Sequence, residues 1–248
     1  MARSTTGDLR EPLLAREAGG MYRERGSRIP GAVVWSWAAT AAATRNRVLP
    51  DGCMDLLWHN GELLVAGPDT QAYVVSETEG AHYTGLRFAP GTAPAVLGVP
   101  AHELRNQRVP LAALWPERTV RPLAERVAAA PERENALEAV VAERLSAAPP
   151  PDPLCGAVVT ALRGGSTVAD TARAAGLSER QLHRRSLAAF GYGPKTLAKV
   201  LRLGQALELA RSGVGLATVA VTAGYADQSH LAHDIKVLTG VPLRALTT

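Results

Sequence analysis

The sequence predicts an α+β protein with a β-rich, barrel-like N-terminal domain, a pair of helices as a connector, and an all-helical C-terminal domain. Three observations support this prediction. Short strand-like segments fill the first half of the chain, a Pro-rich stretch interrupts it near the middle, and one two-helix pattern occurs twice in the last third. With 248 residues, of which 46% are hydrophobic, the chain has enough apolar material for two cores.

The β-rich domain is expected over residues 21–118, after a flexible leader at residues 1–20. The leader has charges of both signs and lacks the apolar core of a signal peptide. Asn60-Gly61 separates two apolar segments and is a strong hairpin signal. Short helical turns broken by prolines are expected after Pro90. Strands are predicted where β-forming residues cluster or alternate, over residues 32–40, 54–60, 62–68, 71–78 and 81–90.

Two helices are predicted next, in a connector that spans residues 119–153. Proline suits the first position of a helix, which predicts helices over residues 122–130 and 131–147. Apolar residues recur at helical spacing in both segments. The sequence APPPDP at residues 148–153 is typical of a stiff linker and marks the clearest domain boundary.

Residues 154–248 are predicted to be entirely helical. Residues 168–185 and 216–234 carry the same pattern at a constant offset of 48 residues, with an alanine–glycine pair at each turn. Two short helices joined by such a tight turn form the helix-turn-helix motif. A lead helix is expected over residues 154–163, and a long helix over residues 195–212 connects the two motifs.

The turn residues of both motifs have physical reasons. Gly176 and Gly224 permit the positive φ that a tight inter-helix turn requires. Ser178, three residues before Gln181, predicts a capping box at the start of the first recognition helix. Asp227 is the equivalent cap candidate in the second motif.

The tandem motif makes DNA binding the leading interpretation, because each copy supplies one helix sized for the major groove. Residues 152–248 hold 11 Lys+Arg and 6 Asp+Glu, whereas residues 1–151 hold 16 and 17. The positive excess therefore accompanies the motifs, as phosphate binding requires. For any single residue of the outward helix faces, a solvated surface is the alternative. The candidate base contacts on these faces are Arg180, His183, Arg184, Gln228, Ser229, His230 and His233.

Residues 154–248 resemble the C-terminal DNA-binding domain of the AraC/XylS family of bacterial transcription regulators. The likeness rests on ADTARAAGLSERQLHR, GYGPKT, the RLxxALxLA run of the connecting helix, and AGYADQSHL with KVLTGVPL. The resemblance implies that the two units occupy successive faces of the major groove through the base contacts named above. It also implies phosphate contacts at Thr167, Ser178, Lys195 and Lys236.

Three positions depart from the family pattern. Ser186 and Ile235 stand where the family usually has aromatic residues, and His233 replaces a common arginine. The first departure bears on the packing of the first recognition helix. The last predicts weaker or pH-dependent reading by the second helix, because histidine titrates near neutrality.

The first domain carries a second resemblance. LPDGCMDLLWHNGELLVAGP, GLRFAPGTA and LGVPAHEL resemble an N-terminal domain of unassigned role in some actinobacterial regulators of the same family. Family members typically carry a sensor or dimerisation domain there, so a small-molecule effector is expected. An effector site needs an apolar pocket with a few polar groups, although plain core packing is the alternative for the aromatic residues. The candidate pocket residues are Trp35, Trp37, Asp55, Trp58, His59, Tyr73, His82, Tyr83 and Arg87.

Two other functions stay open for the N-terminal domain: a protein-docking or dimerisation module, and an enzyme without a recognisable motif. The common catalytic motifs are absent from the sequence, so no enzymatic activity is predicted. No cofactor or metal is predicted either. His230 and His233 have the spacing of metal ligands but no evident third partner, and Cys53 with His59 and His82 is the other group weighed as a metal or redox site.

The remaining expectations concern partners and location. Only two cysteines are present, and no apolar run nears the ~18 residues of a membrane helix, which together favour a soluble cytoplasmic protein. Double-stranded promoter DNA is the expected partner, with RNA polymerase as a second partner if the protein is an activator. The amphipathic helices at residues 122–147 favour a homodimer.

Overall fold

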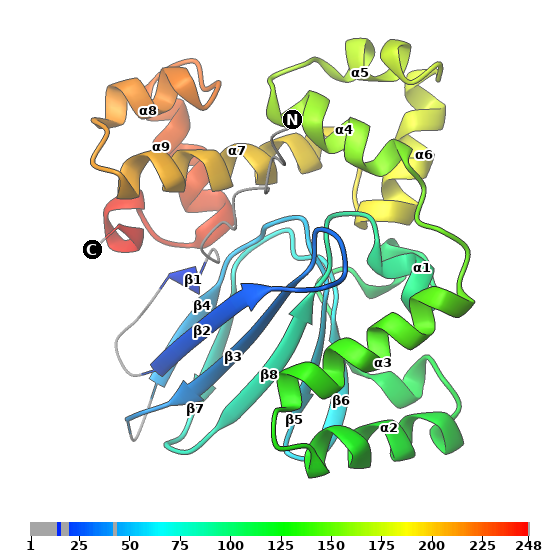
Figure 1. Ribbon diagram of the computed structural model, residues 1–248. Helices are drawn as coiled ribbons and strands as arrows, with labels where there is room; N and C mark the ends of the chain where they lie inside the picture. Colours follow the sequence, from blue (N-terminus) through cyan, green and yellow to red (C-terminus); the bar gives the residue numbers. More distant parts are fainter. Residues whose placement is uncertain (1–13, 16–19, 42–43, 248) are drawn as a thin grey trace, which may run out of the picture.

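The computed structural model describes residues 14–15, 20–41 and 44–247. The leader predicted at residues 1–20 therefore lies almost entirely outside the described residues. An N-terminal domain of two sheets and several helices carries two helical units, which lie at the two ends of the long helix α7 (Pro194–Arg211) (Figure 1). No helix within the described ranges is long and apolar enough to span a bilayer.

Two antiparallel sheets form the N-terminal domain. The larger sheet has the strand order β2-β3-β8-β5-β6-β9, and the smaller has the order β1-β4-β7. The larger sheet consists of β2 (Gly20–Gly26), β3 (Val33–Ala39), β8 (His82–Arg87), β5 (Asp55–His59), β6 (Glu62–Ala66) and β9 (Arg108–Pro110). The smaller sheet consists of β1 (Leu14–Ala15), β4 (Thr44–Val48) and β7 (Tyr73–Glu77).

The β-rich domain is confirmed, but its six-stranded sheet is open and does not close into a barrel. One edge is the three-residue strand β9, which ends at Pro110. Proline has no N–H to donate to a further strand, so pairing stops there. The predicted hairpin is confirmed: Asn60 and Gly61 both have positive φ, 47° and 89°, between β5 and β6.

Sequence analysis missed the two-residue strand β1, in the predicted leader, and the longer strands β2, β4 and β9. The sequences of β2, β4 and β9, GMYRERG, TRNRV and RVP, are rich in charged residues and offer no apolar alternation that would mark a strand. The other long strands fall within the predicted segments. The helical turns expected after Pro90 appear as α1 (Ala93–Leu97) and the 3₁₀ helices η1 (Ala101–Leu104) and η2 (Leu111–Ala113).

The two faces of the larger sheet have different surroundings. On one face, alternate residues such as Leu56, Val65 and Leu86 are fully buried in a core shared with the helices α2 (Glu117–Ala129) and α3 (Arg133–Ala147). The opposite face carries aromatic and charged residues and looks toward the smaller sheet. Period-two alternation along the strands thus separates an apolar core face from a face of aromatic and charged residues.

The helix pair α2 and α3 belongs to this domain and is not a free connector. Val120, Val127, Leu137 and Val141 are buried in the same core as the sheet, and the pair covers the sheet in Figure 1. The first helix also begins earlier than predicted, at Glu117, so that Pro122 lies inside it. Pro122 has no N–H to donate to the carbonyl of Arg118, four residues earlier in the helix. Arg118 is exposed.

The C-terminal domain matches the predicted helices closely. Val168 to Phe190 and Leu216 to Thr239 form the two helix-turn-helix units. The helices are α4 (Leu154–Arg163), α5 (Val168–Ala174), α6 (Glu179–Phe190), α7, α8 (Leu216–Thr222), α9 (Gln228–Thr239) and the 3₁₀ helix η3 (Leu243–Leu246). Each unit has its own core, so local apolar spacing was sufficient to predict these elements.

Glu138 of α3 forms hydrogen bonds with the segment that follows β2, and it is only 1% exposed. Its carboxylate accepts hydrogen bonds from the Ser27 hydroxyl (2.5 Å), the Arg28 backbone N–H (2.6 Å) and the Arg28 guanidinium (3.0 Å). Burial raises the pKa of Glu138, but these hydrogen bonds and a further one from Arg25 outweigh it and lower the pKa from 4.5 to about 2.

This depressed pKa predicts acid destabilisation between about pH 4.5 and pH 2. The stabilisation is present above the unfolded pKa and is lost as pH falls toward the folded pKa, and it amounts to about 3 kcal/mol. In Glu138→Gln, the free energy of unfolding, measured by denaturant titration at several pH values, should be lower at pH 7 and flatter across this interval. An equally steep acid limb in the variant would contradict the assignment.

Candidate functional site

The first recognition helix, α6, begins at a capping box. The Ser178 hydroxyl accepts from the Gln181 N–H (3.3 Å), and the Gln181 side chain accepts from the Ser178 N–H (2.9 Å), as predicted. Arg180, His183 and Arg184 are exposed on α6, whereas Leu182 is fully buried beneath them. A row of cationic and imidazole side chains thus faces away from the core of this unit.

Ser186 is buried in α6, and its hydroxyl has no hydrogen-bond partner among the described residues. The helix is nevertheless continuous to Phe190, which is itself buried in the core of the first unit. The departure from an aromatic residue at Ser186 therefore leaves the helix intact. A small hydroxyl without a hydrogen-bond partner lies where an aromatic ring would make a large apolar contact.

The second recognition helix, α9, begins at Asp227, whose carboxylate accepts from the His230 N–H (2.8 Å). This confirms the predicted cap. Gln228, Ser229 and His233 are exposed on the helix, and Lys236 is exposed one turn before its end. Ile235 is fully buried in the core of this unit, where the family usually has an aromatic residue.

His230 lies differently from the other candidate base contacts. It is half-buried, its ring packs edge-on against Tyr225 at 5.3 Å, and its Nδ1 accepts from the Ala226 N–H (3.3 Å). The Nε2 atom lies 3.5 Å from the Asp234 carboxylate. Both ring nitrogens of His230 thus have protein atoms nearby, and a base contact by this residue stays a prediction.

The candidate phosphate contacts lie at helix starts or on exposed faces. Thr167 caps α5, where its hydroxyl accepts from the Asp170 N–H (3.1 Å), and Ser178 caps α6. Lys195 is exposed in the first turn of α7, and Lys236 is exposed on α9. Helix starts and exposed lysines are both suited to phosphate oxygens.

A buried carboxylate joins the second unit to the long helix α7. Asp234 of α9 is 5% exposed and lies 3.4 Å from Lys199 Nζ and 4.0 Å from Arg202 Nη2, both of α7. Arg202 also donates to the Gly224 carbonyl at the turn (3.1 Å). These contacts fix the orientation of α9 relative to the helix that links the two units.

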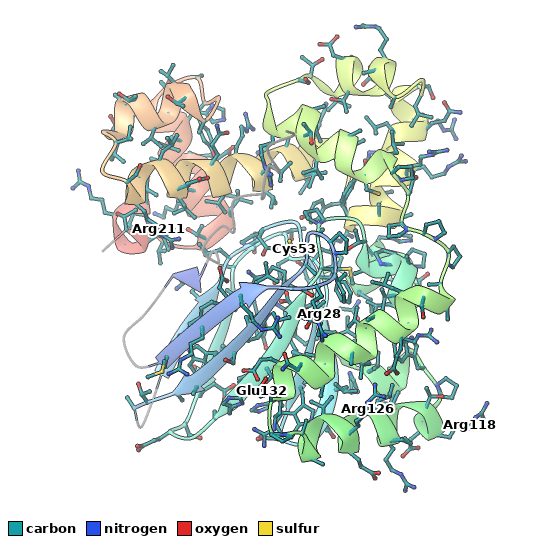
Figure 2. The ribbon with its side chains drawn as sticks, viewed as in Figure 1. Arg28, Cys53, Arg118, Arg126, Glu132 and Arg211 are labelled. Carbon is teal, nitrogen blue, oxygen red and sulfur yellow. The ribbon has the colours of Figure 1, made fainter. Side chains whose placement is uncertain are left out.

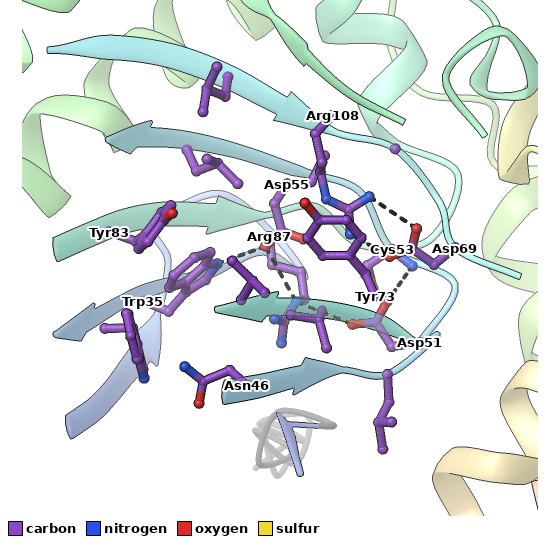
Figure 3. Close-up of a pocket in the computed structure, with 18 of the residues that line it drawn as sticks. Trp35, Asn46, Asp51, Cys53, Asp55, Asp69, Tyr73, Tyr83, Arg87 and Arg108 are labelled. Carbon is purple, nitrogen blue, oxygen red and sulfur yellow. Dashed lines mark hydrogen bonds and ion pairs between the residues drawn. The ribbon is translucent and has the colours of Figure 1, made fainter. Parts of the chain in front are cut away.

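The N-terminal domain contains a cavity of about 200 Å³ between its two sheets (Figure 3). The larger sheet contributes Trp35 and Trp37 of β3, and the smaller sheet contributes Tyr73 of β7. Gly85 of β8 allows the Trp35 ring to lie across the sheet, because a Cβ atom at this position would overlap that ring. The remaining polar lining residues are Asn46, Asp51, Cys53, Asp55, Asp69, Arg87 and Arg108.

The charged groups of the cavity are arranged in pairs. Arg87 Nε lies 3.2 Å from Asp51 and 3.5 Å from Asp55, which also accepts a hydrogen bond from Trp35 Nε1 (2.7 Å). Arg108 donates two hydrogen bonds to Asp69 (2.5 and 3.0 Å). Burial raises the pKa of Asp55, although the charge of Arg87 opposes this shift.

The nine predicted pocket residues divide into three groups. Trp35, Trp37, Asp55, Tyr73, Tyr83 and Arg87 line the cavity. His59 lies behind it, stacked on Tyr83 at 3.8 Å. Trp58 and His82 do not line the cavity, which corrects the prediction for these two residues. They alternate with the lining residues along β5 and β8 and so point to the opposite face, toward α3.

Cys53 lines the cavity, but the opposite orientation of His82 keeps these two from forming a common site. No cluster of three or more potential metal ligands occurs in the part of the chain that the structure describes. Sequence reasoning missed Asp51, Asp69 and Arg108, which come from loops and a short edge strand. Only their positions beside predicted strands could have drawn attention to them.

The loops that close the cavity also hold both helix-turn-helix units. At the first unit, Gly191 packs closely on Pro68, and its carbonyl accepts from Arg105 (3.5 Å). Tyr192, which follows, is 2% exposed and lies near Asp51. Cys53 marks the junction of the sheet with the helical domain in Figure 2.

The second unit rests on the neighbouring part of the same domain. Arg47 donates to the Thr239 carbonyl (2.8 Å), and the Ala72 N–H donates to the Leu238 carbonyl (2.7 Å), both at the end of α9. Leu49 lines the cavity and is also buried in the core of the second unit. One side chain thus belongs to both sites.

Two segments of the chain match known domain families. Residues 171–248 match a helix-turn-helix domain, and residues 32–110 match a domain of unknown function, DUF6597. Together with the motifs quoted above, the first match identifies the C-terminal part as an AraC-type helix-turn-helix domain. No curated protein matches the sequence.

Solved structures of ToxT from Vibrio cholerae resemble the chain at low identity. One covers 93% of this chain and 100% of ToxT at 9% identity, with a TM-score of 0.47. ToxT bound to a methylnaphthalenyl butenoic acid covers 92% and 100% at 10% identity, with a TM-score of 0.47. ToxT bound to an unsaturated fatty acid covers 96% and 98% at 11% identity, with a TM-score of 0.45. Both ligands are bound by ToxT in these structures.

Replacing Asp234 with asparagine should destabilise the second unit. The change keeps the shape of the side chain but removes the charge that Lys199 and Arg202 face, which should cost roughly 1.5–3 kcal/mol of the free energy of unfolding. Denaturant titration measures this loss. The matched control is Glu125→Gln, which breaks an exposed pair with Arg121 and should have little effect. Equal small losses in both variants would contradict a role for Asp234.

Proposed function

We propose that the protein binds promoter DNA through both recognition helices and that a small molecule in the N-terminal cavity controls this binding. The observation that carries the proposal is Leu49, which lines the cavity and packs in the core of the second helix-turn-helix unit. A ligand that moves the segment around Leu49 changes the support of the DNA-reading helix. Binding energy can thereby shift the relative stability of two arrangements of the units.

For the DNA-reading part, base contacts are assigned to the exposed residues of the two helices. Arg180, His183 and Arg184 read bases from α6, and Gln228, Ser229 and His233 read them from α9. Arginine is the best bidentate partner of guanine, whereas glutamine suits adenine. Thr167, Ser178, Lys195 and Lys236 contact phosphates and set the register.

The length of α7 supports the simultaneous use of both helices. Its 18 residues span about 27 Å at 1.5 Å per residue, which is comparable to the ~34 Å of one turn of B-DNA. The Asp234 ion pairs reduce the freedom of the second unit on this helix. The two motifs thus act as one bipartite reader, which contacts a single DNA site at two places. A homodimer would double the length of that site.

Arg184→Ala should weaken binding to a selected operator by about 1–3 kcal/mol and relax discrimination at one base pair. The operator is first obtained by selection from random DNA with the purified protein, and affinities are then measured for single-base variants. Lys236→Ala should instead weaken binding to all sequences alike and reduce the salt dependence by about one unit. Arg118→Ala, on exposed α2, is the control for charge alone. Equal losses on operator and random DNA for Arg184→Ala would refute base reading by this residue.

Leu49→Ala should weaken operator binding about threefold or more, although Leu49 is not on the DNA-reading helices, because it loosens the support of α9. The matched control is Leu137→Ala, which creates a cavity in the core between sheet and helices, away from both units. Both variants should lose about 2–5 kcal/mol of stability, so affinities are compared at a temperature where both remain folded. If both variants bind the operator like the wild type, Leu49 does not couple cavity and DNA.

A further inference from the structure

The cavity combines aromatic walls with an excess of carboxylates. Five of the eleven aromatic residues in the chain line it: Tyr22, Trp35, Trp37, Tyr73 and Tyr83. Two pairs among them pack together, Tyr22 with Trp35 at 6.1 Å and Trp37 with Tyr83 at 5.9 Å. Aromatic ring faces attract cations as well as apolar groups.

The carboxylates outnumber the guanidinium groups on this face. Asp51, Asp55 and Asp69 line the cavity, against Arg87 and Arg108. Two further carboxylates accept hydrogen bonds from lining tyrosines: Glu24 from Tyr22 (2.8 Å), and Glu77 from Tyr83. Three lining carboxylates therefore face two lining guanidinium groups, so the cavity wall carries one more acidic than basic side chain.

Both arginines already have partners, which bears on the charge of a ligand. Arg87 lies between Asp51 and Asp55, and Arg108 is held by both oxygens of Asp69 while its guanidinium covers the Tyr73 ring at 4.3 Å. A bound anion would lie close to the carboxylates that flank both arginines and would be repelled by them. A bound cation adds the positive charge that the carboxylates lack, because three carboxylates line the cavity against two guanidinium groups.

An unpartnered donor in the wall indicates a second feature of the ligand. Asn46 of β4 is 8% exposed and lines the cavity, and its Nδ2 has no hydrogen-bond partner among the described residues. A buried amide N–H without a partner is unfavourable, and an acceptor oxygen on a ligand would satisfy it. Asn46 lies below the Arg87 pair in Figure 3.

We propose that the cavity binds a small organic cation, an ammonium compound with an apolar surface and one hydrogen-bond acceptor. The cationic group lies against the rings of Trp35, Trp37 and Tyr83 beside Asp55, and the acceptor meets Asn46. This inference rests on the proposed function in that it assigns the chemical class of the effector. It does not depend on how the protein contacts DNA.

The test compares three probes of similar shape that differ in charge. They are choline, its uncharged carbon isostere neohexyl alcohol, and the anion tert-butylacetate, all of which carry an acceptor oxygen. Binding to the full chain without DNA is measured by titration calorimetry and by quenching of tryptophan fluorescence. Choline should bind at least about tenfold more tightly than either other probe.

Two variants and a control locate the effect. Glu24→Gln, at the edge of the cavity, and Asp55→Asn, within it, should each weaken choline binding severalfold and leave neohexyl alcohol binding unchanged. Glu117→Gln, on exposed α2, should leave both unchanged. Circular dichroism melting of each variant verifies that it is folded.

The outcomes separate the two proposals. Tighter binding of tert-butylacetate or of neohexyl alcohol than of choline would overturn the cationic class, while the cavity would remain an effector site. Failure of all three probes to bind would overturn the cationic class. If choline binds as expected but operator affinity is the same with and without saturating choline, the ligand class stands and control of DNA binding by the cavity is refuted.

Discussion

The ends of both recognition helices rest on the loops that close the cavity of the N-terminal domain, and the other features of the molecule depend on this contact. Gly191, just after α6, packs on Pro68, and the last carbonyls of α9 accept hydrogen bonds from Arg47 and Ala72. Leu49 continues the contact into the core of the second unit. The two helix-turn-helix units are therefore positioned by α7 and by the N-terminal domain together, which is why we propose that a ligand beside these loops acts on both units.

The larger sheet of the N-terminal domain is asymmetric because its two faces have different surroundings. The helices α2 and α3 bury one sheet face in an apolar core, which leaves the other face free for aromatic and charged side chains. Glu138 holds α3 in place through a dense set of hydrogen bonds. The face that lines the cavity can thus carry buried charges without loss of the fold, because the stabilising core lies on the opposite side.

The sequence was sufficient for those parts in which local signals decide the structure. The capping box at Ser178 and the glycine turns fixed the C-terminal helices within a residue or two, and Asn60-Gly61 fixed the central hairpin. The strands β2 and β4 were missed because edge and covering strands carry no apolar alternation. Six of the nine predicted pocket residues line the cavity, whereas Asp69 and Arg108 come together only through pairing of distant strands, which no local pattern encodes.

The central claim, that one rigid bipartite reader is held at a fixed separation, is tested most directly by the spacing of its DNA site. After the operator has been selected, affinity is measured for a series in which one to five base pairs are inserted between the two contacted halves. In the wild type, insertion is expected to reduce affinity about tenfold or more, because α7 and the docked loops fix the distance between the two recognition helices. Affinity that does not change with spacing would contradict a fixed separation.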